Sequence, residues 1–97
     1  MNIKKYQKYA RSKWQPGVDY ITLALGLGGE TGEVLDIIKK ARRDSKPIDL
    51  DHLEEELGDV FWYLVNLCYV FNFPIGKLLD KNVNKLEQRY PTEGKQK

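Results

Sequence analysis

The sequence predicts an all-α protein organised as a four-helix bundle. Between the turn signals, apolar residues recur every three or four positions, which is the repeat of one face of an α-helix. No segment shows the strict apolar–polar alternation of a half-buried strand. Turn signals at Gln15-Pro16-Gly17, Asp44–Pro47 and Asn72-Phe73-Pro74 leave four helical segments with short connections, and such segments typically pack as a bundle.

The helix boundaries follow from these signals. We expect the helices to run from about Asn2 to Trp14, Tyr20 to Arg43, His52 to Phe71, and Pro74 to Tyr90. Asp51 is the expected N-cap of the third helix, and Glu54, three residues later, would complete a capping box. Pro74 is a favourable first helical residue. The polar tail, residues 91–97, is expected to fray.

Length and composition indicate one domain over residues 1–97. Charged residues make up 31% of the chain but the formal charge is only +2, which suits a soluble globular protein and gives no reason to expect a nucleic-acid or membrane partner. The first residues lack the apolar run of a signal peptide. Cys68 is the only cysteine, so no intrachain disulfide can form. We therefore expect a cytoplasmic protein.

The third helix predicts a homo-oligomer. Trp62 and Tyr69 lie opposite its main apolar stripe, so the helix is apolar nearly all round and needs cover nearly all round. The stripe consists of Leu53, Leu57, Val60, Phe61, Leu64 and Cys68. One small chain has too few helices to provide that cover. We therefore expect a homodimer or homotetramer.

Acidic residues stand where a core is expected. At about 100° per residue, Glu30 falls within the apolar stripe of the second helix and Glu33 on its flank. Glu56 and Asp59 lie one turn apart beside the stripe of the third helix. A single pair of this kind most often lies on a solvated face, but two pairs, one with a misplaced Glu30, favour a buried cluster. Inward carboxylates repel one another, and Mg²⁺, with Mn²⁺ as a possible substitute, relieves the repulsion and prefers oxygen ligands and phosphate.

Two further features accompany the acids. Glycines gather around the first acidic pair, where they indicate either a close helix approach, room for a ligand, or a simple helix break; they are Gly26, Gly28, Gly29 and Gly32. On the fourth helix, Asn82, Lys85 and Arg89 follow i, i+3, i+7 spacing. An amide and two cations suit a polyphosphate chain. An ordinary basic helix end explains the same residues equally well.

Two runs resemble a known family. Leu25 to Glu33 reads LGLGGETGE and Glu55 to Tyr63 reads EELGDVFWY, and together they resemble the MazG-like nucleotide pyrophosphohydrolases of the all-α NTP pyrophosphatase superfamily. Their pattern is E-x-x-E, a spacer, and E-x-x-D; here 22 residues separate the two pairs. The similarity extends to Tyr6-Gln7 and to the run from Asn82 to Pro91. It covers nearly the whole chain, with a single catalytic segment.

The resemblance implies hydrolysis of a nucleoside triphosphate to the monophosphate and pyrophosphate, as house-cleaning of the nucleotide pool. It also implies that the four acids hold magnesium, that water attacks the α-phosphorus, and that the protein is a dimer or tetramer around a shared four-helix core. The candidates for phosphate contacts are Lys39, Asn82, Lys85 and Arg89. Glu33, less enclosed than Glu30, is our candidate for the residue that orients the water.

Two other functions stay open on the sequence. A non-catalytic helical interaction module could use the acids for a structural cation or a basic partner, although Glu30 within an apolar stripe argues against it. A nucleotide-binding regulator without turnover could share the same cluster, and only an activity assay separates it from an enzyme. His52, the only histidine, is expected to lie on the solvated surface at a helix start.

Overall fold

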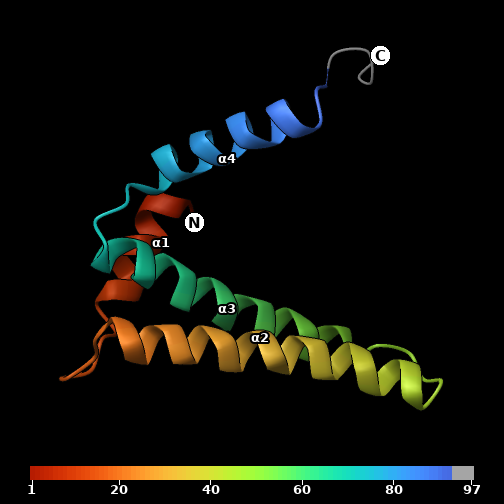
Figure 1. Ribbon diagram of the computed structural model, residues 1–97. Coiled ribbons are helices and arrows are strands. Elements are labelled where there is room, and N and C mark those ends of the chain that lie inside the picture. The colour runs from red at the N-terminus through yellow and green to blue at the C-terminus, as the bar shows by residue number, and fades with distance from the viewer. Residues whose placement is uncertain (93–97) are drawn as a thin grey trace.

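The computed structural model describes residues 1–92, and within that range the chain is all-helical (Figure 1). Its four helices are α1 (Ile3–Arg11), α2 (Tyr20–Arg43), α3 (Leu50–Val70) and α4 (Ile75–Arg89). No strand occurs in this part of the chain, as the apolar periodicity predicted. Residues 93–97, most of the tail that was expected to fray, lie outside the described residues.

Side-chain caps fix the starts of three helices. Asn2 Oδ1 accepts a hydrogen bond from Lys5 N at 2.9 Å, and Asp19 Oδ1 accepts one from Thr22 N at 2.9 Å. Such caps satisfy backbone N–H groups that have no partner within the helix.

At α3 the cap is Asp49, whose Oδ1 accepts a hydrogen bond from His52 N at 3.2 Å. The predicted N-cap, Asp51, is wrong because the helix starts at Leu50 and Asp51 already lies in its first turn. The predicted capping box between Asp51 and Glu54 is therefore wrong as well. Pro74 likewise precedes α4 as its N-cap residue and is not the first helical residue.

The packed part of the molecule is built on α3. α2 and α3 lie side by side and run in opposite directions, and α1 packs on α3 (Figure 1). The small core between them consists of Ala10, Leu23, Val65 and Cys68. Aromatic contacts join α1 to α3, with the rings of Tyr6 and Phe61 centred 5.5 Å apart. This arrangement fixes the face of α3 that meets α2.

The last helix, α4, diverges from the α2–α3 pair (Figure 1). None of its residues is buried, and its apolar stripe is exposed to solvent, with Leu79 at 50% and Val83 at 56% of their full accessible surface. A single chain therefore does not close the predicted four-helix bundle. The physical reason is that no other helix of the described chain packs along this stripe. The bundle stays a prediction for an assembly.

The chain is also open in its dimensions. Its radius of gyration is 16.6 Å, whereas a compact domain of this length has about 12.5 Å. Its accessible surface is 7976 Å², whereas a compact monomer of 11.3 kDa exposes about 5,700 Å². None of the helices described is long and apolar enough to cross a membrane.

Candidate metal centre

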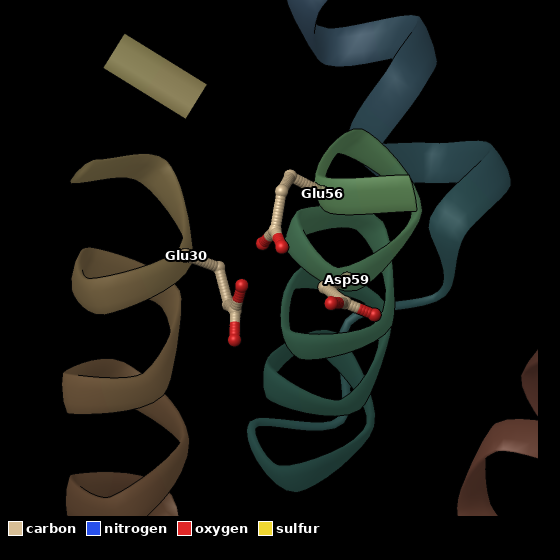
Figure 2. Close-up of side chains that lie close together, drawn as sticks. All are labelled: Glu30, Glu56 and Asp59. Atoms are coloured by element: carbon tan, nitrogen blue, oxygen red, sulfur yellow. The ribbon is translucent and has the colours of Figure 1, made fainter. Parts of the chain in front are cut away.

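Three carboxylates meet between α2 and α3. One oxygen from each of Glu30, Glu56 and Asp59 lies within 4.8 Å of the others. Figure 2 shows Glu30 reaching from α2 toward Glu56 and Asp59 on α3. Glu30 and Glu56 are partly buried and Asp59 is exposed, so the group stands at the edge of the helix pair. This separation allows one cation to reach all three residues.

Helix geometry explains the convergence. Glu56 and Asp59 are three residues apart, so they project from the same side of α3. Glu30 faces them because α2 and α3 approach closely one turn earlier, at Gly26. A Cβ at Gly26 would overlap the ring of Tyr63, so this glycine makes room for the tyrosine. Gly28, Gly29 and Gly32 have open space around them within the described chain.

The three carboxylates repel each other strongly. The pKa of Glu30 is raised to about 7, first by a hydrogen bond that its protonated carboxyl makes with Glu56, then by desolvation and by the neighbouring negative charges. Glu56 Oε2 is buried and has no hydrogen-bond partner among the described residues. A proton on Glu30 relieves the repulsion, whereas a divalent cation would relieve it and also supply a partner for this oxygen. The donor set, all carboxylate oxygen, fits a hard cation such as Mg²⁺ or Mn²⁺.

Glu33, predicted as the fourth acid, lies outside this group. It is exposed on α2, one turn after Glu30, and lines a neighbouring hollow of about 240 Å³ together with Asp36, Lys40 and His52. Its charge still adds to the raised pKa of Glu30. Its assignment as a metal ligand and as the residue that orients water stays a prediction.

The four candidate phosphate contacts are not gathered around the acids within one chain. Lys39 lies on α2 with its Nζ 3.7 Å from Asp36 Oδ1. Asn82 and Lys85 line a hollow along α4, and Arg89 ends that helix. Since α4 diverges from the α2–α3 pair, these three residues are separated from the acids by the course of the chain (Figure 1).

One residue near the centre was missed by the sequence interpretation. His52, expected to be a solvated surface residue, is half-exposed but has its Nε2 3.4 Å from Glu56 Oε1. The signal was present in the sequence, because His52 and Glu56 are four residues apart on one helix and therefore share a face.

Tyr6, on α1, is close enough to Asp59 to feel its charge. Burial raises the pKa of its hydroxyl, and the charge of Asp59 raises it further. Its ring packs against Phe61, two residues after Asp59. α1 therefore packs on α3 near Asp59, which itself stays exposed.

An all-helical chain with three carboxylates gathered across one helix pair fits the class of enzymes that use a hard divalent cation to act on phosphate esters. Residues 19–93 match the family model of the MazG nucleotide pyrophosphohydrolase domain, and the chain belongs to this family. The three clustered carboxylates are all within the matched region. Membership implies nucleotide pyrophosphohydrolase activity as the class of reaction and a divalent metal as its cofactor.

The chain is also similar to a phage protein, the "Gene 37 protein" of Mycobacterium phage L5. The two are 36% identical over 77 residues, which cover 75% of this chain and 66% of the phage protein. The chain thus spans just under two thirds of that relative's length. No solved structure matches the chain significantly.

Proposed function

We propose that this protein hydrolyses a nucleoside triphosphate to the nucleoside monophosphate and pyrophosphate, with magnesium bound by Glu30, Glu56 and Asp59. The observation that carries the proposal is the convergence of these carboxylates within 4.8 Å, inside a region that matches a pyrophosphohydrolase family. The proposed biological role is house-cleaning of the nucleotide pool in the cytoplasm, with manganese able to replace magnesium.

Each residue has a defined task in this reaction. A divalent ion bound by the three carboxylates would polarise the phosphoryl oxygens and lower the pKa of a bound water. Glu33, outside the cluster but one turn along α2, would accept a proton from the water that attacks the α-phosphorus. It is exposed and lies outside the group of three clustered carboxylates, so it would stay free to orient a water molecule while the other acids bind the ion.

The active form is proposed to be a homo-oligomer, a dimer or a tetramer. The chain exposes roughly 2,200 Å² more surface than a compact monomer of its mass. That excess is in the range that each subunit of an obligate oligomer buries. The uncovered stripe of α4 and the half-exposed Leu57 and Leu64 of α3 supply apolar surface for the contact. A second copy is the natural occupant, because every copy carries the same uncovered surface.

The same assembly would complete the substrate site. Lys85 and Arg89 lie on α4, which has no buried residue and leaves its apolar stripe exposed within the described part of the chain. We place them, with Asn82, against the triphosphate bound at the carboxylates of another subunit, where their charges stabilise the departing pyrophosphate. Lys39 is the candidate contact from within the same chain.

The test of the reaction is hydrolysis in ¹⁸O-labelled water with Mg²⁺, across a panel of canonical and damaged nucleoside triphosphates. We expect pyrophosphate as the first product and the label in the nucleoside monophosphate, because water attacks the α-phosphorus. Label in pyrophosphate, or orthophosphate as the first product, contradicts this route. Nucleotide binding without turnover across the whole panel would instead favour a regulator.

A further inference from the structure

His52 has a contact that a surface histidine at a helix start does not need. Its Nε2 lies 3.4 Å from Glu56 Oε1, and the side chain of Glu56 is only 15% exposed. The start of α3 holds the histidine in place, since its backbone N–H donates to the Asp49 cap. From there the imidazole reaches one turn along the helix to the carboxylate.

The two oxygens of Glu56 therefore have different surroundings. Oε1 contacts the imidazole of His52, whereas Oε2 is buried and lacks a hydrogen bond within the described residues. Figure 2 shows the Glu56 carboxylate directed toward Glu30. His52 itself lies outside the group of three carboxylates. It is thus a neighbour of a ligand and not one of the ligands.

We propose that His52 is a positioning residue: it holds Glu56 through Oε1 so that Oε2 is presented to the divalent cation. The inference rests on the metal centre proposed above and adds a residue to it. The physical reason is entropic and geometric. A glutamate side chain with one oxygen already held loses less rotamer freedom when the other oxygen binds an ion, and it presents that oxygen in a fixed direction.

A purely structural role predicts something different. An i, i+4 pair that serves only the helix stabilises the fold slightly and has no effect on a metal. Loss of His52 would then lower the melting temperature slightly and leave metal affinity unchanged. Affinity for the metal alone therefore separates the two roles, and it does so without reference to turnover.

The experiment measures the Kd for Mn²⁺, without nucleotide, by titration calorimetry and by the electron paramagnetic resonance signal of free Mn²⁺. The proteins are the full-length wild type, His52→Ala, His52→Gln and the control Glu54→Ala, which truncates an exposed side chain in the same region of α3. Circular dichroism melts accompany each titration. Gln retains an N–H donor that can reach one helical turn. The His52→Gln variant therefore shows whether a donor to Glu56 is sufficient without the imidazole ring.

We expect His52→Ala to weaken Mn²⁺ binding about tenfold, which is the lower end of the effect of residues that orient metal ligands. His52→Gln should return the Kd to within about threefold of the wild type, and Glu54→Ala should leave it within about twofold, since neither loses the orienting contact. Equal affinities of wild type and His52→Ala, or a His52→Gln protein as weak as His52→Ala, would overturn the positioning role while leaving the metal centre in place. A wild type that binds no Mn²⁺ would overturn the metal centre and this inference together.

Discussion

Glu30 is partly buried, has a raised pKa and belongs to the proposed metal centre. Its carboxyl faces two other acids across the helix pair, and its pKa is raised to about 7, mainly through its hydrogen bond with Glu56. A metal ion must displace the shared proton, because carboxylates bind cations in the ionised form. Metal binding and protonation at this residue therefore compete.

The first prediction concerns stability against pH without metal. The folded-state pKa of Glu30 lies above the value of 4.5 for the free side chain. Between the two values the folded protein binds more protons than the unfolded one, so this residue's contribution to stability falls as pH rises from about 4.5 to about 7. Glu30→Gln mimics the protonated form. In EDTA it should be close to the wild type in stability at pH 5 and more stable than the wild type at pH 8.

Urea unfolding at one protein concentration measures this difference. Adding Mg²⁺ or Mn²⁺ at pH 8 should reverse the order, because the wild type gains a ligand-binding contribution that the Gln variant loses. If the two proteins responded identically to pH in EDTA, the raised pKa of Glu30 would be contradicted.

The second prediction separates the roles of the acids. Asp59→Asn should raise the metal concentration needed for half-maximal activity, since it removes one of three clustered oxygens. Glu33→Gln should leave that concentration nearly unchanged and lower kcat by about 10²-fold, because a general base acts only as the transition state forms. Steady-state kinetics over a range of Mg²⁺ concentrations tests both variants. A Glu33→Gln enzyme with normal kcat would remove Glu33 from the chemistry.

At the scale of the elements, the α2–α3 pair contains one especially close contact. Gly26 on α2 lies against the ring of Tyr63 on α3, and any β-carbon at this position would overlap the ring. The contact is one turn from Glu30 on α2 and one turn from Asp59 on α3. The spacing of these two helices therefore sets the distance between the carboxylates.

The third prediction compares two glycines in α2. Gly26→Ala should destabilise the protein by about 1–3 kcal/mol, the usual cost of overpacking, and weaken metal binding because the helices must separate. Gly29→Ala meets open space within the described chain, so it should stabilise the helix by about 0.5–1 kcal/mol. Denaturant unfolding measures both. Equal effects of the two substitutions would argue against the close approach at Tyr63.

At the scale of the whole molecule, the main feature is the large area that one chain exposes to solvent. The chain exposes more area than a compact monomer needs, and α4 extends away with its apolar stripe uncovered (Figure 1). An uncovered apolar stripe of this kind is typical of an interaction site. The proposed oligomer would therefore affect both the stability of the protein and the completeness of the proposed substrate site.

The fourth prediction tests the stripe. Val83→Asp places a charge in the middle of the exposed apolar stripe and should dissociate the oligomer, because burying an unpaired carboxylate is very costly. Asn84→Asp introduces the same charge at the next residue, off the stripe, and serves as the control. Sedimentation velocity at micromolar concentration distinguishes them. A wild type that sediments as a folded monomer would contradict the proposed assembly.

The fifth prediction tests whether α4 acts on a neighbouring subunit. At a Mg²⁺ concentration that just saturates the wild type, Asp59→Asn and Lys85→Ala chains should each have little activity alone. When they are co-expressed, a dimer with one chain of each kind contains one site with both changes and one with neither, so about a quarter of all sites are intact in a random mixture. Pyrophosphate release should recover accordingly. If both residues act within one chain, mixing restores nothing.

Much of the helical structure follows from local sequence. Apolar periodicity and the turns around Pro16, Pro47 and Pro74 place all four helices, and the bounds of α2 agree with the prediction at both ends. The ends of α1 and α3 were less well predicted. Residues 13 and 14 close i→i+3 turns after α1, and Asp49 competes with Asp51 for the cap of α3. Several neighbouring polar residues can serve as a cap, so sequence alone does not choose among them.

For the carboxylates too, one part of the arrangement follows from local sequence and another part from tertiary contacts. Helical periodicity alone shows that Glu30 lies on an apolar face and that Glu56 and Asp59 share a face. Tertiary packing brings these three residues together and leaves Glu33 outside the group. It also sets the contact between His52 and Glu56 and the divergence of α4 from the helix pair. These facts depend on how far and at what angle two helices approach. That geometry is set by contacts between residues distant in the chain, such as Gly26 with Tyr63.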